Sequence, residues 1–329
     1  MTLKRLCKFY FKLEVKFKIA DTGVVKLILL LGASGRLGRS IQAELTARRV
    51  PFLYPSKDEL NIFDYQAVDQ FVSNHKIDLV VHCASLLTPR MASVTQAKID
   101  AENASLMDQN IFKLVEKRHL QLLFISTSLI YPSQSHQAWS EIDFGTFPKP
   151  PIDREYYAKM KYESTRKVVG LGSRGLNCSA IVLPNLLAGP IPGIDRYDQL
   201  CEKLFKLTQD ASASGEQSIA FNVAINPQLQ LVAGFEIAQW LGFVISQELD
   251  LPPLLNLSSS YSATPFELLA EMINQRYSGL SIITEGVRQQ TLSYSLNDSY
   301  ARDSFQWFGG QSLSGSVDIW LTEILHGKK

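Results

Sequence analysis

Residues 26–38 read Lys26-Leu-Ile-Leu-Leu-Leu-Gly32-Ala-Ser-Gly35-Arg-Leu-Gly38, and this stretch decides the fold. An apolar, strand-like run enters three glycines spaced G-x-x-G-x-x-G, and apolar Leu37, Ile41 and Leu45 follow at helical spacing. The pattern predicts a strand, a tight turn and a helix start. Glycine permits the strained turn and a close approach to a pyrophosphate, whose charge the free N–H groups of a helix N-terminus would bind. The spacing differs by one residue from the G-x-G-x-x-G fingerprint, so a Gly-rich turn without a ligand is the alternative.

Strand-like and helix-like segments alternate after this turn. Strands are predicted over 26–31, 51–54, 77–82, 120–125 and 178–183, and helices over 65–71, 94–115 and 155–169. Such alternation predicts an α/β protein with a doubly wound parallel sheet of the Rossmann type. The strands are nearly continuous in apolar residues, which fits a sheet that is buried on both faces.

The chain divides into three predicted regions. Residues 26–183 form a dinucleotide-binding domain, to which a return segment at about 229–248 also belongs. Residues 184–329 form mainly a smaller substrate-binding lobe that closes over the strand C-termini, where open α/β sheets bind ligands. Residues 1–25 are basic and lack a continuous apolar core, so we expect a poorly packed extension rather than a signal peptide. An amphipathic membrane-surface segment is the alternative for these residues.

Composition narrows the functional classes. The 329 residues are 46% hydrophobic and 20% charged with a net charge of +1, so nothing indicates a nucleic-acid partner. The longest apolar run, 27–31, is far shorter than the ~18 residues of a membrane span. The four cysteines are scattered without a C-x-x-C pair, which favours free thiols in a reducing compartment and no metal site. We therefore expect a cytoplasmic protein without a membrane partner.

Tyr157 and Lys161 form a Tyr-x-x-x-Lys pattern on the predicted helix 155–169. Residues four apart share a helix face, and a lysine ammonium there would stabilise a tyrosinate, which favours proton exchange near neutral pH. The pattern alone is weak, because the chain has twelve tyrosines. Its position is informative, because the preceding strand runs into the hydroxyl residues 126–128, which could bond a substrate oxygen beside the tyrosine.

Taken in order, these elements resemble the extended short-chain dehydrogenase/reductase superfamily, the NAD-dependent epimerase/dehydratase group. The resemblance covers roughly residues 26–329 and is nearest to dTDP-4-dehydrorhamnose reductases and GDP-fucose synthases. It rests on the glycine turn and on Glu59-Leu-Asn-Ile-Phe-Asp64, Ser126-Thr-Ser-Leu-Ile-Tyr-Pro132, Leu183-Pro-Asn-Leu-Leu-Ala-Gly-Pro190 and Trp320-Leu-Thr-Glu-Ile-Leu325. It implies an NAD(P)-dependent oxidoreductase that reduces a keto group of a nucleotide-diphosphate sugar. A homodimer is implied as well.

The resemblance assigns site residues to this sequence. Thr127 and Tyr157 would bind the substrate oxygen, Tyr157 would act as general acid or base, and Lys161 would favour the tyrosinate and hold the nicotinamide ribose. The implied catalytic residues are Thr127, Tyr157 and Lys161. The implied cofactor-binding residues are Gly32, Ser34, Gly35, Arg36, Leu37, Gly38, Ser56, Asp64, Ala84, Ser85 and Lys161. The implied substrate-binding residues are Thr127, Ser128 and Asn185, with Arg196 as a further candidate. No metal ligand is predicted.

The sequence also departs from parts of the family pattern. Leu129 stands where GDP-fucose synthases have the cysteine used for epimerisation, and no histidine occurs between His136 and His326. Dehydratases follow the catalytic threonine with Asp-Glu, whereas this chain has Ser128 and Leu129. Simple reduction is therefore favoured. An epimerase with bound NAD and a non-catalytic, cofactor-binding regulatory subunit are the alternatives.

The cofactor preference depends on a few charged residues. Arg36 and Arg39, together with the hydroxyl of Ser56, would suit a 2′-phosphate, so NADP(H) is favoured over NAD(H). Asp58 argues for NAD, because it lies near the spacing at which an acid binds ribose hydroxyls. A solvated helix face is the plain alternative for the two arginines.

Four other polar positions allow a plain interpretation. Cys83 is expected to pack in the core, His82 to be a strand-end histidine and Glu163 to lie on the surface. Asn103 has two open interpretations: an ordinary helix residue, or the superfamily asparagine that organises a water near the lysine.

Overall fold

The computed structural model describes residues 26–86, 93–132, 138–147, 155–188, 200–224, 226–277, 279–286 and 295–326. Its centre is a parallel sheet in the order β2-β1-β3-β4-β5-β9. The strands are β1 Ile28–Leu31, β2 Phe52–Leu53, β3 Leu79–His82, β4 Gln121–Thr127, β5 Cys178–Leu183 and β9 Leu254–Asn256. Every neighbouring pair is parallel, which confirms the doubly wound α/β fold expected from the sequence.

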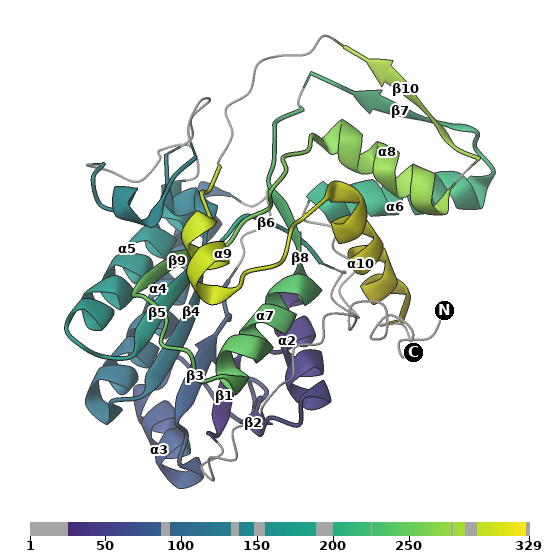
Figure 1. Cartoon of the computed structure of the whole chain (residues 1–329). Helices are drawn as coiled ribbons and strands as arrows, with labels where there is room; N and C mark the ends of the chain where they lie inside the picture. Colours follow the sequence, from purple (N-terminus) through teal and green to yellow (C-terminus); the bar gives the residue numbers. More distant parts are fainter. Residues whose placement is uncertain are drawn as a thin grey trace.

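Helices cover both faces of the sheet, as Figure 1 shows. One face packs against α3 Tyr65–His75, α4 Val94–Arg118 and α5 Glu155–Ser173. The other packs against α2 Arg36–Ala47, α7 Gly234–Ser246 and α9 Ser299–Phe305. Side chains alternate between the faces, so Leu29 joins the first layer while Ile28 joins the second. Both are fully buried, which explains why the strands are apolar on both sides.

The strand order reverses at the centre of the sheet. The chain passes from β1 to β2 on one side and returns to β3 on the other, so β1 lies between them. Leu31 pairs with His82 at the ends of β1 and β3. Open α/β sheets bind ligands outside the strand C-termini at such a switch point. The glycine turn after β1 therefore lies at the expected place.

A second group of elements forms a smaller lobe. Its core joins α6 Leu200–Ser214, α8 Pro265–Arg276 and α10 Leu313–His326 with the paired strands β6 Asn185–Leu187 and β8 Leu231–Ala233. The parallel ribbon of β7 Ser218–Asn222 and β10 Ser281–Glu285 lies at the outer edge of this lobe (Figure 1). Within the described residues, no helix combines the length and apolarity that crossing a membrane requires.

Candidate active site at the strand C-termini

The glycine turn is closely packed against the end of β3. Gly32 has φ +86°, and a Cβ atom there would lie 2.5 Å from the backbone nitrogen of Ala84. At Gly38 a Cβ would lie 2.0 Å from the carbonyl oxygen of Gly32. Neither position can hold a side chain without moving backbone, because real Cβ atoms do not approach so closely. These two glycines therefore join β1, β3 and α2 into one tight corner.

Gly35 has a different role from its neighbours. Its φ of −73° and ψ of 176° are extended backbone that any residue adopts, so the sequence-based expectation of a strained turn at this position was wrong. A Cβ at Gly35 would meet only the carbonyl oxygen of Gly32, at 3.1 Å. Gly35 instead precedes α2, which has no side-chain cap and no acidic residue in its first turn. The first N–H groups of α2 thus lack helical acceptors and can bind an anion.

Arg36 and Arg39 contact acids of the smaller lobe. Arg36 forms a two-pronged ion pair with Glu202 of α6, its Nη2 donating to Oε2 at 2.9 Å, and the side chains are only 11% and 0% exposed. Burial lowers the pKa of Arg39, although the charge of Glu323 on α10 opposes this shift. Ser40 also donates a hydrogen bond to Glu323. The solvated-face interpretation therefore does not hold for Arg36, whose charge is already matched by a carboxylate.

The turn after β2 carries the predicted contacts Ser56 and Asp64. Ser56 is exposed, and its backbone nitrogen donates to the Glu59 carboxylate at 2.7 Å. Hydrogen bonds from the backbone and side chain of Ser56 lower the pKa of Glu59. Asp64 caps α3, because its Oδ1 accepts from the backbone nitrogens of Gln66 and Ala67. Sequence reasoning missed Glu59, whose negative charge lies beside the hydroxyl that was expected to face a 2′-phosphate.

The end of β3 presents a hydroxyl without a partner. The side-chain oxygen of Ser85 is buried and has no hydrogen-bond partner in the described residues. The adjacent Cys83 donates both its backbone N–H and its thiol to the carbonyl oxygen of Leu31, each at 3.0 Å. Burial raises the pKa of the Cys83 thiol to about 12, so this cysteine is inert as expected. The unsatisfied hydroxyl after β3 and the uncapped N–H groups at the start of α2 together fit a dinucleotide with ribose hydroxyls and phosphates.

Lys161 is fixed against β4 near its C-terminus. Its side chain is almost fully buried, and Nζ donates to the carbonyl oxygen of Ile125 at 3.1 Å. Thr127 ends the same strand two residues later and caps the short helix η1 Ser128–Ile130, its hydroxyl lying 3.4 Å from the backbone nitrogen of Leu129. The helix that carries Lys161 packs against both β4 and η1. Lys161 and Thr127 therefore both lie at the C-terminal end of β4, and we call this end, with Tyr157, the corner of the site.

Tyr157 lies one turn before Lys161 on α5. It is half-buried against Ala104, Met107 and Met160, and its hydroxyl has no hydrogen bond to any described residue. Positions four apart lie on one helix face, so tyrosine and lysine face the same side. A phenol without a hydrogen bond to the described residues, one helix turn from a buried ammonium, is a suitable arrangement for proton transfer.

The hydroxyls next to Thr127 on β4 and η1 differ in their partners. Ser126 is buried, and its hydroxyl lies 2.6 Å from that of Thr165 on α5. Ser128, predicted to bind substrate, is also buried. Of the neighbouring hydroxyl residues 126–128, Thr127 is therefore the more accessible.

Other predicted positions lie at the margin of this site. Asn185 opens β6 and is exposed, and its backbone and side-chain nitrogens both face the carbonyl oxygen of Gln230, at 3.2 and 3.4 Å. Arg196 lies outside the described residues. Asn103 is exposed on α4, which favours the ordinary helix interpretation. Glu163 is on the surface, where it pairs with Arg166.

Sequence reasoning missed a buried polar cluster behind Lys161. Asp108 of α4 is 1% exposed, and the hydroxyl of Ser164 donates to its Oδ2 at 2.6 Å. His82 is fully buried, and its Nε2 lies 3.0 Å from Asp108 Oδ1 in a poorly aligned, electrostatic contact. Burial acts to raise the pKa of Asp108, but the His82 contact and the charge of Lys161 outweigh it and lower that pKa. The sequence signal for this cluster was Asp108 itself, a carboxylate among the apolar residues on the buried face of α4.

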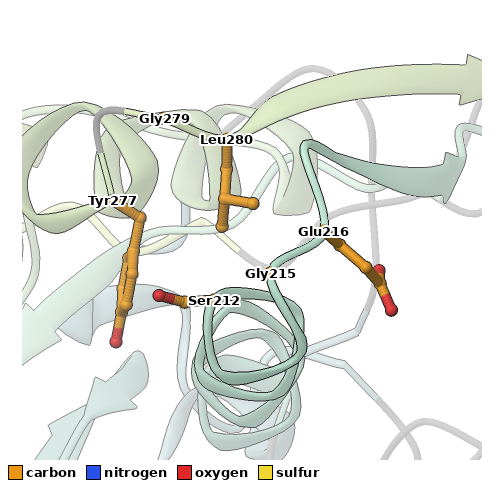
Figure 2. Close-up of a pocket in the computed structure, with 6 residues that line it drawn as sticks. All are labelled: Ser212, Gly215, Glu216, Tyr277, Gly279 and Leu280. Atoms are coloured by element: carbon orange, nitrogen blue, oxygen red, sulfur yellow. The ribbon is translucent and has the colours of Figure 1, made fainter.

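The described residues contain no cluster of three or more side chains suited to a metal ion. A small pocket of about 200 Å³ lies elsewhere, between the ends of α6 and α8 and the start of β10 (Figure 2). Its lining residues are Ser212, Gly215, Glu216, Tyr277, Gly279 and Leu280. None of them belongs to the predicted site.

A doubly wound sheet with a glycine turn at its switch point defines a dinucleotide-binding fold of the extended short-chain dehydrogenase/reductase class. The sequence model of the "NAD dependent epimerase/dehydratase family" matches residues 28–217, and the chain belongs to this family. This membership confirms the resemblance found in the sequence.

Individual relatives are distant. A GDP-L-fucose synthase of Escherichia coli (strain K12) is 26% identical over 131 residues, which are 39% of this chain and 41% of that protein. Two of the curated relatives, this one included, are matched over only 37% and 41% of their length. A GDP-L-fucose synthetase of Naegleria fowleri bound to NADP superposes with a TM-score of 0.75 at 13% identity, covering 92% of this chain and 95% of the other. A GDP-mannoheptose C4 reductase of Campylobacter jejuni with NADP bound superposes with a TM-score of 0.73 at 16% identity over 90% and 98%. At such low sequence identities, the structural similarity shows the fold alone.

Proposed function

We propose that the chain is an NADP(H)-dependent oxidoreductase that reduces a keto group of a nucleotide-diphosphate sugar. The observation that carries this proposal is the corner formed by Thr127, Tyr157 and Lys161. Lys161 Nζ bonds to β4 two residues before Thr127, and Tyr157 lies on the same face of α5 with its hydroxyl unbonded. This corner and the glycine turn both lie at the carboxyl edge of the sheet, where open α/β sheets bind ligands.

Each residue has a defined task in this proposal. The hydroxyls of Thr127 and Tyr157 bind the substrate carbonyl oxygen, and Tyr157 Oη donates its proton to that oxygen during reduction. Lys161 stabilises the tyrosinate that remains, through its positive charge. The N–H groups at the start of α2 and the hydroxyl of Ser85 hold the dinucleotide. A nicotinamide cofactor, when bound, supplies the hydride.

Reduction without further rearrangement is supported by what the site lacks. Leu129 follows Ser128 on η1, so this segment has neither the cysteine expected for epimerisation nor the Asp-Glu pair expected for dehydration. No histidine occurs between His136 and His326. The remaining groups at the corner suffice to protonate a carbonyl oxygen.

The preference for NADP(H) rests on the solved structures of similar fold that hold NADP. The local charges at the turn after β2 argue less clearly, because Arg36 is paired with Glu202 and Glu59 lies beside Ser56. We nevertheless expect NADPH to bind more tightly than NADH. We expect this difference in affinity to come from neutral hydroxyl contacts and from Arg39. Calorimetric titration with both cofactors measures this difference, and tighter binding of NADH would reverse the assignment.

The proposed reaction can be tested with purified protein, NADPH and a panel of GDP- and dTDP-linked 4-keto sugars. We expect loss of NADPH absorbance with at least one of them. Tyr157→Phe should lower that turnover by about 10²–10⁴-fold, because it removes only the proton donor. Tyr156→Phe, on the adjacent and equally half-buried tyrosine, is the matched control and should retain turnover.

Other outcomes would replace the proposal with a defined alternative. Tight NADPH binding without turnover of any sugar in the panel would indicate a regulatory subunit. Purification with bound NAD and interconversion of sugar epimers would indicate an epimerase. Near-normal turnover by Tyr157→Phe would remove this tyrosine from the reaction.

A further inference from the structure

The buried ammonium of Lys161 needs a compensating charge. Its side chain is 3% exposed, so solvent does not stabilise the charge. The carbonyl oxygen of Ile125 accepts one hydrogen bond at 3.1 Å, and the ring of Phe124 lies 4.6 Å from Nζ. Both contacts are favourable, but neither carries a charge. A buried ammonium is costly unless an anion pairs with it.

Few ionisable groups among the described residues lie near Lys161. Asp108 of α4 and Cys83 after β3 interact electrostatically with it, His82 of β3 contacts Asp108, and Tyr157 lies on the same helix. The neighbouring β4 and η1 have no ionisable side chain. Burial raises the pKa of the Cys83 thiol to about 12, so it stays neutral. Asp108 is thus the carboxylate of this cluster.

Asp108 is held in place by two elements other than its own. Ser164, three residues after Lys161 on α5, donates to Oδ2 at 2.6 Å. His82 of β3 lies 3.0 Å from Oδ1. Ser164 and Lys161 share one face of α5, so the hydrogen bond from Ser164 holds Asp108 on the side of α5 that carries the ammonium.

We propose that Asp108 is a positioning residue whose carboxylate is the counter-ion of Lys161 and helps to hold the ammonium against β4. Asp108 does not touch substrate or cofactor in this arrangement. It acts through Lys161, which in turn acts on Tyr157. The role in turnover rests on the proposed function, whereas the pairing of the two charges is a property of the folded chain and can be tested separately.

A double-mutant cycle tests the pairing by thermal unfolding, without substrate or cofactor. Asp108→Asn preserves shape but leaves the ammonium uncompensated, so we expect Tm to fall by several degrees. The same change in the Lys161→Met background should cost less than half of that fall, because no charge remains to be matched. Additive losses would overturn the proposal. If Asp108→Asn alone does not fold, the double variant decides, because the proposal requires Asp108→Asn combined with Lys161→Met to fold.

The pH dependence of NADPH affinity tests the positioning role. Asp108→Asn removes the carboxylate charge that interacts with the ammonium of Lys161, so we expect the profile of NADPH affinity against pH to differ from that of the wild type. Asp108→Glu should restore the profile. Glu163→Gln, which removes an exposed carboxylate on the same helix, is the matched control and should leave the profile in place. An unchanged profile in Asp108→Asn contradicts the positioning role.

The two tests also separate this inference from the proposed function. Thermal coupling without any NADPH binding would reject the function and retain the counter-ion pair. NADPH binding and turnover with an additive cycle would reject the pair and retain the function.

Discussion

Three glycines in one turn have different physical reasons to be glycine. Gly32 needs a positive φ of +86° and leaves no room beside Ala84, and Gly38 leaves no room beside the Gly32 carbonyl. Gly35 has ordinary backbone angles and only one neighbour, at 3.1 Å. The folded chain therefore gives little reason for glycine at position 35, and we expect that reason to be the approach of a bound ligand.

Substitutions at Gly32 and Gly35 should consequently affect different properties. Gly32→Ala should reduce the free energy of unfolding by at least about 1–2 kcal/mol, because a left-handed backbone alone costs an L-residue that much. Gly35→Val should fold normally and lose NADPH binding, because the side chain occupies the approach to the first N–H groups of α2. Urea unfolding and calorimetric titration measure the two effects. Wild-type NADPH affinity in a folded Gly35→Val protein would contradict the phosphate-binding role of this turn.

Helices α3 and α4 are joined at the surface by one carboxylate with two cationic partners. Asp69 accepts hydrogen bonds from Lys117 Nζ and Arg118 Nε, both at 2.8 Å. The Arg118 and then the Lys117 hydrogen bonds lower the pKa of Asp69 to about 2. Since the pKa of Asp69 in the folded protein lies below the ordinary aspartate value of 3.8, this pairing stabilises the protein above that pH, and the stabilisation is lost as pH falls toward 2.

Asp69→Asn should therefore destabilise the protein at pH 7 and not at low pH. The expected loss at pH 7 is about 0.2–1 kcal/mol, because the cationic partners are exposed and water screens the pair. The difference from wild type should shrink as pH falls below about 4. Asp303→Asn on α9 is the control, because Asp303 is exposed and forms no ion pair with the described residues. A constant difference across this pH range in urea unfolding would contradict the pairing.

Elements whose signal is local could be predicted from sequence. The strand at Cys178–Leu183 matches the prediction because six successive apolar or small residues are buried together. The three-residue strand β6 was missed, because Asn185–Leu187 becomes a strand only through pairing with β8, some 46 residues later. The pairing of β9 with β5 likewise joins residues more than 70 positions apart and could not be predicted from the residues of β9 alone.

The candidate site shows the same division between local and distant information. Tyr157, Lys161 and the glycine turn follow from spacing within one helix or turn. The partners of Asp108 and Arg36 lie 56 and 166 residues away, so no local pattern could reveal them. Arg36 was consequently expected to face a phosphate rather than Glu202. In a sequence, such buried pairs are indicated only by polar residues at positions where the helix pattern calls for apolar ones.

The molecule as a whole is expected to fold without its first 25 residues. The first core strand starts at Ile28, whose backbone nitrogen donates a hydrogen bond to the carbonyl oxygen of Pro51. Its neighbouring strands, β2 and β3, come from later in the chain. Deleting residues 1–25 should therefore leave Tm and NADPH affinity nearly unchanged. Thermal unfolding and titration of the shortened chain check this expectation. A fall of many degrees would show that these residues contribute to the core.

The two lobes are connected by buried charges, which should make them unfold together. Arg36 begins the helix at the dinucleotide turn, whereas Glu202 belongs to α6 of the smaller lobe and is completely buried. Glu202→Gln removes the carboxylate that pairs with the Arg36 guanidinium, and breaking one half of a buried pair costs about 3–5 kcal/mol. We expect a lower Tm and weaker NADPH binding, since the start of α2 loses its anchor.

A matched control and a rescue make this last prediction specific to burial. Asp210→Asn breaks the exposed pair with Lys206 on the same helix, 2.6 Å apart, and should cost less than about 1 kcal/mol. Replacing both buried partners, Arg36→Met with Glu202→Leu, should recover most of the lost stability, because apolar groups can substitute for a buried ion pair. Recovery of stability without recovery of NADPH affinity would assign Arg36 a direct part in holding the cofactor. Equal losses from Glu202→Gln and Asp210→Asn would instead mean that the two lobes are joined by their apolar contacts alone.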